Sequence, residues 1–254
     1  MLGKGREYIE KTSSMLALIV DEQENAIAQA AEVITESLLD KHALFAFGNV
    51  HSAFTIGDTY IRAGGLALVN QIMAPVISSL EYDPADLWMG MERLEGYGKL
   101  VFDTTPAQEG DVIIVVSTSG RNNVPIEMAE NAKIKGLKVI VITSMKYSRH
   151  QPSRHRSGKL LYEFADVVID NYSVPGDAIL EIEGLDVPFC PTSGVISTAI
   201  LQTLMAEVIE RLVKAGAEPP VYIAGNLDGY EEYRARFEEN INTNKYRIFY
   251  TPVI

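Results

Sequence analysis

The stretch DVIIVVSTSGRNNVPIEMAENAKIKGLKVIVIT, residues 111–143, contains two apolar runs separated by a polar loop and a helical segment. Residues 111–117 and 138–143 are rich in Val and Ile at consecutive positions, which is typical of strands buried on both faces of a parallel sheet. Between them, residues 125–136 predict a helix, since Pro125 suits its first turn and Gly136 its C-terminal cap. Strand, loop, helix and strand in this order predict a βαβ unit.

The pattern continues on both sides of this unit. Apolar runs predict two further buried strands, at residues 43–48 and 165–170. Apolar residues at helical spacing predict a long buried helix from Ser193 to Ala215 and N-terminal helices over residues 4–40. Within the latter, Asp21 is a candidate cap for a second helix.

The remaining chain predicts an edge strand at 221–225 and then, over 228–250, a polar helix with a short extended tail. We therefore expect one α/β domain over residues 1–254, a three-layer sandwich with a central parallel sheet of the flavodoxin or Rossmann-like type. Its expected parts are N-terminal helices (1–42), a core sheet with its helices (43–216) and a C-terminal extension (217–254).

Composition narrows the class of protein. The 254 residues are 47% hydrophobic and 22% charged, which is ordinary for a globular protein, and the net charge is −12. This acidity argues against a nucleic-acid or membrane-coating partner. Cys190 is the only cysteine, so an internal disulfide and a thiolate metal cluster are both excluded, and we expect no metal site. No signal-peptide pattern and no apolar run of membrane-spanning length occur, so we expect a cytoplasmic protein.

In a parallel sheet, ligands bind where the strands end. The loop after the strand at 111–117 reads STSGRNN and leads directly into a helix. The N-terminus of a helix attracts phosphate, and Ser117, Thr118 and Ser119 can donate hydrogen bonds to its oxygens. Arg121 can add a charge-assisted bond, and Asn122 an amide donor. These residues predict an anion site, whereas the alternative is that they only cap the helix and form the turn.

Two stretches of the chain resemble a known family. The stretch 117–144 resembles the core motif of the sugar isomerase (SIS) domain, in which a Ser/Thr-rich loop holds a sugar phosphate, and GNVHSAFTIGDTYIRAGG (48–65) resembles the family's first loop and the following helix. The resemblance implies the SIS fold, no cofactor, and a homodimer or homotetramer with shared sites. It also implies that Ser52, Ser117, Ser119 and Asn122 hold the phosphate.

An aldose–ketose isomerase needs a base that moves a proton between C1 and C2, and an acid that opens the ring. The resemblance to phosphoheptose isomerases places their base near Arg62, where Asp58 is the nearest carboxylate. Those enzymes also carry a His on the last long helix, and its absence from residues 193–216 argues against that particular activity. His51, next to Ser52, is a second candidate for acid–base work, with a hydrogen-bonded loop histidine as the alternative.

Two charged segments leave alternatives open. The acidic segment containing Glu81, Glu92 and Glu95 favours a solvated face over a catalytic role. The segment from Lys146 to Lys159 has five Lys or Arg, two His and no acid. There, Arg154 or His155 either faces a second anionic or polar part of the ligand or is simply solvated.

The expected function is therefore a phosphosugar isomerase that works through an enediol. The alternatives are a sensor or regulator that binds a phosphosugar without turning it over, or a phosphosugar etherase or lyase. A dinucleotide enzyme is disfavoured, because no Gly-x-Gly-x-x-Gly follows any predicted strand.

Overall fold

A computed structural model describes residues 2–78 and 85–249. Its central sheet has five parallel strands in the order β2-β1-β3-β4-β5. The strands are β1 (Leu44–Gly48), β2 (Val69–Gln71), β3 (Val112–Val116), β4 (Lys138–Thr143) and β5 (Val167–Asp170). The predicted parallel sheet is confirmed, and β1 and β3 pair from Leu44↔Val112 to Gly48↔Val116.

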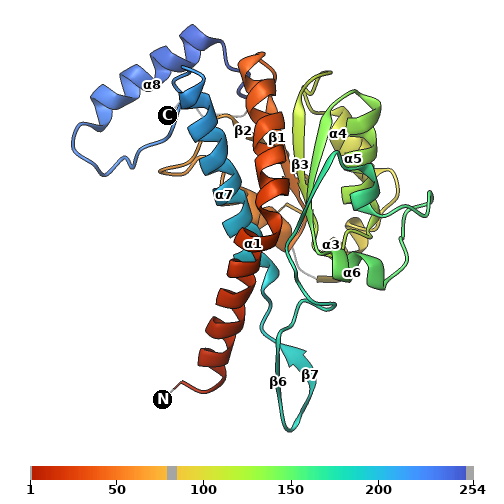
Figure 1. Ribbon diagram of the computed structural model, residues 1–254. Helices are drawn as coiled ribbons and strands as arrows, with labels where there is room; N and C mark the ends of the chain where they lie inside the picture. Colours follow the sequence, from red (N-terminus) through yellow and green to blue (C-terminus); the bar gives the residue numbers. More distant parts are fainter. Residues whose placement is uncertain (1, 79–84, 250–254) are drawn as a thin grey trace.

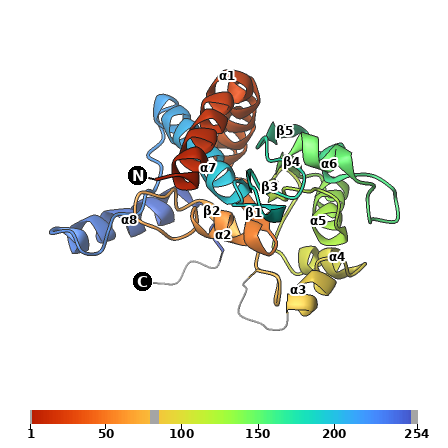
Figure 2. The ribbon, with the colours of Figure 1, turned by 90° about the horizontal axis from the view of Figure 1, so that it is seen from below.

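Helices cover both faces of this sheet, which makes the predicted three-layer α/β sandwich (Figures 1 and 2). Helices α1 (Lys4–Leu39) and α7 (Ser193–Lys214) pack on one face, and α4 (Tyr97–Asp103) and α5 (Asn123–Ile134) on the other. Alternate residues of β3 divide between the two layers: Ile114 packs under α1 and α7, and Ile113 and Val115 pack under α4 and α5. This explains why the strands are apolar at every position.

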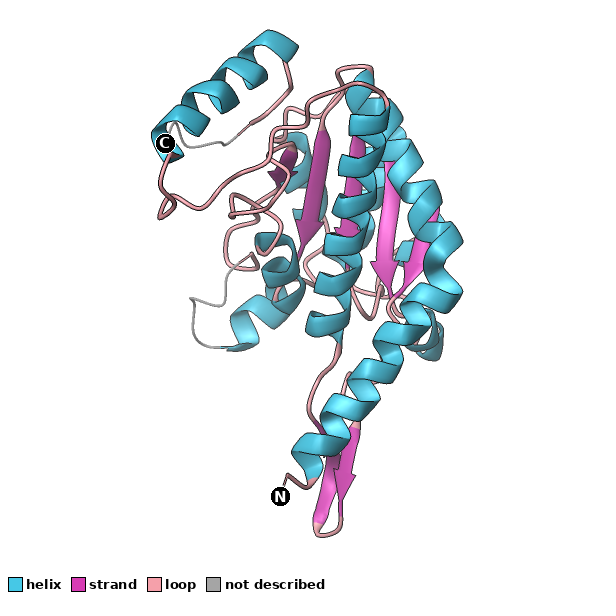
Figure 3. Ribbon diagram, turned by 60° about the vertical axis from the view of Figure 1, so that its left-hand side comes forward, coloured by secondary structure: helices cyan, strands magenta, loops and turns pink. Residues whose placement is uncertain are grey.

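Short elements connect these layers. They are α2 (His51–Gly57), α3 (Ala85–Met91), α6 (Met145–His150), a 3-10 turn at Leu161–Phe164, and the antiparallel pair β6 (Leu180–Ile182) and β7 (Leu185–Phe189). The β6–β7 hairpin projects from the body beside the N-terminal part of α1 (Figure 3). Lys11 Nζ donates to the Ile179 carbonyl at 3.0 Å and joins these two projections.

Two expectations need correction. The N-terminal region forms one continuous helix, because Asp21 lies exposed inside α1 without breaking it. Residues 221–225 form no strand, and only Val221 makes an isolated bridge, to Leu66. This segment instead pairs with the loop before β2, where Gly64 N–H donates to the Tyr222 carbonyl at 2.7 Å.

The C-terminal part of the described chain forms α8 (Tyr230–Asn244), the predicted polar helix, and then returns to the sheet. Asn70 of β2 binds this tail on both sides: its Nδ2 donates to the Arg247 carbonyl at 3.1 Å and its Oδ1 accepts from Phe249 N–H at 2.6 Å. The ring of Phe249 stacks on Phe45 with centroids 5.9 Å apart. The tail therefore covers the edge strand of the sheet.

Arg247 in this tail neutralises a buried carboxylate. Asp111, at the start of β3, is fully buried and accepts hydrogen bonds from Ala43 N–H at 2.8 Å and Gln108 N–H at 2.7 Å. It forms an ion pair with Arg247, whose guanidinium also donates to the Pro106 carbonyl at 3.0 Å, and His42 Nδ1 lies 3.7 Å from its Oδ1. Because a buried charge is costly without a partner, the tail contributes to the stability of the core.

Among the described residues, no helix combines the length and apolar content needed to cross a membrane.

Candidate functional site

A cleft of about 1010 Å³ lies at the carboxyl ends of the strands. Five regions line it: α2 with the residues before it, the end of α3 with the residues that follow, the β3–α5 loop, α6 with the loop after it, and the residues on either side of the β6–β7 hairpin, 176–178 and 189–198. The cleft brings together most of the predicted site residues: His51, Ser52, Asp58, Ser117, Thr118, Ser119, Arg121, Asn122 and Arg154.

The two predicted binding loops contribute four hydroxyl-bearing residues to the lining of this cleft: Ser52, Ser117, Thr118 and Ser119. Within residues 2–78 and 85–249, none of these hydroxyls has a hydrogen-bond partner, although Ser117 is buried. A hydroxyl donates one hydrogen bond and accepts others, so the four groups are available to a ligand.

The polar residues of the β3–α5 loop do not cap the helix that follows them. Asn122 precedes α5, yet its side chain makes no cap and its Oδ1 accepts from Arg154 Nη1 at 2.5 Å. Val124 N–H donates to the Glu92 carbonyl at 3.2 Å, and Pro125 has no N–H to offer. The structure therefore does not support the capping alternative, and the positive end of the α5 dipole remains at the cleft.

Close backbone packing holds the two serine-bearing loops. A Cβ on Gly48 would lie 2.4 Å from the Ser52 carbonyl oxygen, so only glycine allows α2 to begin directly above the end of β1. Val50, between them, has φ +55° and donates its N–H to the Ile77 carbonyl at 2.5 Å. Gly120 has φ +57°, which glycine adopts without strain.

His51 lies exposed at the first position of α2. Its ring meets those of Trp88 and Phe54 nearly edge-on, with centroids 6.3 Å apart in both pairs. The histidine thus lies among aromatic side chains at the rim of the cleft.

Asp58 follows α2 and connects it to α7. One carboxylate oxygen pairs with Arg62, and the other accepts from Gln202 Nε2 at 3.0 Å. Both oxygens of this predicted base are therefore already engaged by the protein.

Glu92 also lines the cleft, although the acidic segment that contains it was predicted to form a solvated face. Asn49 Nδ2 donates to its Oε2 at 2.8 Å. Burial raises the pKa of the Glu92 carboxyl, and hydrogen bonding from Asn122 and the positive charges of Arg93 and Arg154 oppose this shift. A carboxyl with a raised pKa in a cleft is a candidate for proton transfer.

The neighbouring acidic residues differ from Glu92. Glu95 is exposed and lies 3.5 Å from Arg156, so it is solvated as expected. Glu81 lies outside the described residues.

Arg121 and Arg154 connect two loops at the cleft. Arg154 N–H donates to the Arg121 carbonyl at 2.8 Å, and Arg121 Nε donates to the Pro152 carbonyl at 3.0 Å. These two hydrogen bonds connect the loop that follows α6 to the β3–α5 loop.

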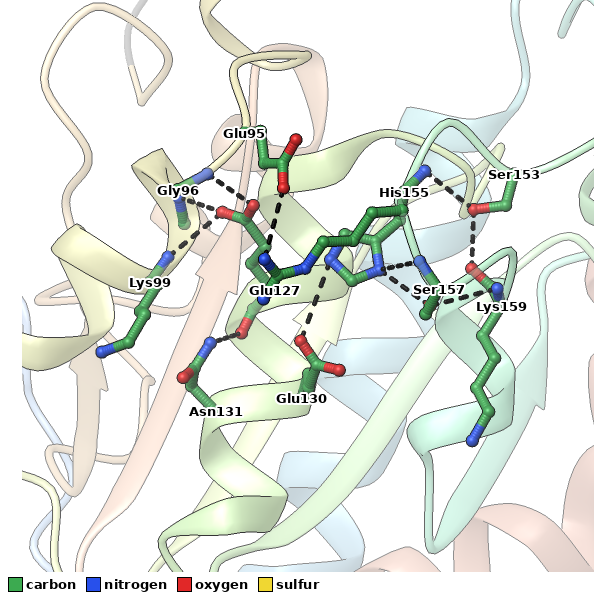
Figure 4. Close-up of polar contacts among 12 residues, drawn as sticks. Glu95, Gly96, Lys99, Glu127, Glu130, Asn131, Ser153, His155, Ser157 and Lys159 are labelled. Atoms are coloured by element: carbon green, nitrogen blue, oxygen red, sulfur yellow. Dashed lines mark hydrogen bonds and ion pairs between the residues drawn. The ribbon is translucent and has the colours of Figure 1, made fainter.

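The expectation for His155 needs correction, because its side chain is 1% exposed and does not line the cleft. Its Nδ1 lies 2.8 Å from Ser157 Oγ, and its Nε2 lies 3.8 Å from Oε2 of Glu130 in α5. Figure 4 shows both contacts. The backbone N–H of His155 donates to Ser153 Oγ at 3.0 Å. His155 therefore stabilises the loop that contains Arg154, and its side chain does not face the cleft.

Glu127 of α5 fixes the segment that follows Glu92 and Arg93. Its carboxylate accepts from the N–H groups of Gly96 at 2.6 Å, Gly98 at 2.8 Å and Lys99 at 3.3 Å (Figure 4). These bonds satisfy the N-terminus of α4, so α5 positions the 92–96 segment against the cleft.

Replacing Glu92 by Gln tests the environment of this carboxylate. Since the folded protein holds the Glu92 proton more tightly than the unfolded chain, wild-type stability falls as pH rises from about 4.3 through the raised pKa. Glu92→Gln has no carboxyl to titrate and so does not lose this stability. The difference in free energy of unfolding, variant minus wild type, should therefore increase from pH 4 to pH 7 in urea titrations. Glu95→Gln controls for the loss of one charge in the same loop. If the difference in free energy of unfolding between Glu92→Gln and wild type stayed constant across this pH range, Glu92 would not be a buried carboxyl with a raised pKa.

Within the described residues, no group of three or more His, Cys, Asp or Glu side chains is arranged to hold a metal ion.

An open parallel sheet with a hydroxyl-rich cleft at its carboxyl edge defines a class of α/β ligand-binding proteins. The family model of the SIS domain matches residues 7–144 of this chain. A UPF0309 protein of Streptomyces griseus is 39% identical over 244 residues, which cover 96% of either chain. A UPF0309 protein of Halalkalibacterium halodurans is 40% identical over 226 residues, 89% of this chain and 90% of the relative. The chain therefore belongs to the SIS domain family, among the UPF0309 proteins.

Solved structures agree on the fold. A phosphoheptose isomerase from Francisella tularensis superposes with a TM-score of 0.53 at 16% identity, covering 82% of this chain and 97% of that one. A putative phosphosugar isomerase involved in capsule formation from Bacteroides fragilis superposes with a TM-score of 0.52 at 20% identity, covering 92% and 95%.

Proposed function

We propose that this SIS-domain protein binds a sugar phosphate in the cleft and isomerises it between aldose and ketose forms through an enediol. The proposal rests on the hydroxyls of Ser52, Ser117, Thr118 and Ser119 beside the start of α5, which have no hydrogen-bond partner in the described part of the chain. Hydroxyl donors and a helix N-terminus suit a phosphate without requiring a basic surface. The names of the two structural neighbours, a phosphoheptose isomerase and a putative phosphosugar isomerase, support the same substrate class.

Of the side chains that line the cleft, we consider His51, Asp58 and Glu92 as candidates for proton transfer, because the Asp177 carboxylate is held by Thr192 and Ser193 at the start of α7. Asp58, the base expected from the sequence, is held by Arg62 and Gln202 at both oxygens. Glu92 is held by amide groups, and burial raises its pKa toward the range that suits a general base. We therefore assign the transfer between C1 and C2 to Glu92, and to His51 the acid role in ring opening.

The proposal retains the features expected from the sequence: a cytoplasmic protein without a cofactor, in a homodimer or homotetramer. The alternatives are a phosphosugar sensor that uses the same cleft without turnover, and an etherase or lyase.

Thermal-shift measurements with a panel of aldose and ketose phosphates test binding. At a ligand concentration 100 times Kd, the melting temperature should rise by about 5–10 °C. Ser119→Ala removes a hydrogen bond to a charged group and should weaken binding about 10- to 100-fold. Ser14→Ala, an exposed hydroxyl on α1, is the matched control. Binding by Ser119→Ala at wild-type strength would contradict the assignment of this loop.

Proton exchange separates the enzyme from the sensor. With a sugar phosphate that binds, NMR in deuterated buffer should show exchange of the C2 proton. Glu92→Gln should bind and lose the exchange, whereas Asp58→Asn should retain it. Exchange by Glu92→Gln at the wild-type rate would refute the assignment of the base, and binding without exchange by the wild type would favour a sensor.

A further inference from the structure

Three arginines from three separate segments line the cleft and lie close enough to one another to interact electrostatically. Arg93 follows α3, Arg121 belongs to the β3–α5 loop, and Arg154 follows α6. Within the described ranges, none of them has a carboxylate within ion-pair distance. Most other arginines of the described chain do have one: Arg6, Arg62, Arg156, Arg211, Arg234 and Arg247.

The protein holds these three arginines in place with neutral acceptors and donors. Arg154 Nη1 donates to Asn122 Oδ1 at 2.5 Å, and Arg121 Nε donates to the Pro152 carbonyl at 3.0 Å. Asn123 Nδ2 donates to the Arg93 carbonyl at 2.8 Å, which fixes the backbone at that position. Each guanidinium retains N–H donors beyond these bonds, and a planar, oriented guanidinium suits a carboxylate or phosphate.

Their charges are not balanced locally. Desolvation lowers the pKa of Arg154, and the positive charges of Arg121 and Arg93 lower it further, while Glu92 acts in the opposite direction. Glu92 is the carboxylate close to this group, and its own burial disfavours its charged form. An excess of positive charge thus gathers in one place on a chain of net charge −12.

The cleft also contains more hydrogen-bond donors and positive charge than one phosphate requires. Four hydroxyls and the start of α5 provide the hydrogen-bond donors for a phosphate, which leaves the arginines for another group. The cleft volume of about 1010 Å³ is at the upper end of the range for small-molecule sites. We infer that the ligand carries a second anionic group, a phosphate or a carboxylate, which Arg93, Arg121 and Arg154 bind. This inference rests on the proposed function and narrows its substrate class to sugar phosphates with two acidic groups.

Matched ligand pairs test the inference by calorimetry. Glucose 6-phosphate against 6-phosphogluconate adds a carboxylate, and fructose 6-phosphate against fructose 1,6-bisphosphate adds a phosphate. The doubly anionic member of at least one pair should bind wild type about tenfold or more tightly, the equivalent of one charge-assisted hydrogen bond. The pair that shows the difference identifies the second group.

Arg154→Gln and Arg93→Gln should reduce this preference about tenfold while leaving the affinity for the singly anionic member within about threefold. Arg149→Gln, an arginine of α6 outside the cleft, is the matched control and should leave both affinities unchanged. The inference would be overturned if wild type bound both members of each pair equally, or if the variants lost affinity equally for both members. In the second case the arginines would hold the same phosphate as the hydroxyls. Either result would leave the proposed function standing. If no sugar phosphate binds at all, the proposed function itself fails.

Discussion

Gly48→Ala is expected to abolish sugar phosphate binding and to lower the free energy of unfolding by about 3 kcal/mol. The new Cβ would lie 2.4 Å from the Ser52 carbonyl oxygen and 3.0 Å from the Ala53 nitrogen, which are backbone atoms of the first turn of α2. This turn has to move to relieve the overlap, and it carries His51 and Ser52 away from the β3–α5 loop. Urea unfolding measures the stability, and calorimetry with the best ligand of the panel measures the binding.

Gly57→Ala is the matched control, because Gly57 is the last residue of the same helix and nothing lies within 4 Å of its Cβ position. It should be neutral or stabilise the protein by up to about 1 kcal/mol. If Gly48→Ala bound ligand as well as Gly57→Ala does, the close contact between β1 and α2 would not shape the site.

Arg247→Ala is expected to lower the free energy of unfolding by about 3–5 kcal/mol. The substitution removes the guanidinium that pairs with the fully buried carboxylate of Asp111 and leaves only the more distant His42, at 3.7 Å, as its ion-pair partner in the described chain. It also removes the hydrogen-bond donor of the Pro106 carbonyl. It also loosens the tail that covers the edge of β2 through Asn70. Urea unfolding of the full chain measures the change.

Two variants control for other causes. Lys245→Ala removes an exposed positive charge from the same tail and should change stability by less than about 0.5 kcal/mol. Asp111→Asn should restore part of the loss when it is combined with Arg247→Ala, since it removes the buried charge. If Arg247→Ala were as stable as Lys245→Ala, the tail would not neutralise Asp111.

The main sheet could be predicted from the sequence because its strands are apolar on both faces. Residues 111–117 and 138–143 become β3 and β4 with boundaries within one residue, and the loop that follows β3 therefore falls at the carboxyl edge of the sheet. β2 has three residues, of which Asn70 and Gln71 are polar, so no apolar run indicates it. Its asparagine is explained by the C-terminal tail, which is distant in the sequence.

Long-range contacts limited the prediction of the site. Glu92 and Arg93 reach the β3–α5 loop through Val124 and Asn123, a juxtaposition that no local spacing encodes. For His155 the sequence indicates a basic segment but not the direction of each side chain, and the ring is buried against Ser157 and Glu130.

A crystal structure of the protein with the sugar phosphate that gives the largest thermal shift shows directly where the phosphate binds. We expect the phosphate within hydrogen-bond distance of the Ser117, Thr118 and Ser119 hydroxyls, at the start of α5. A phosphate held elsewhere, with these hydroxyls unoccupied, would contradict this prediction.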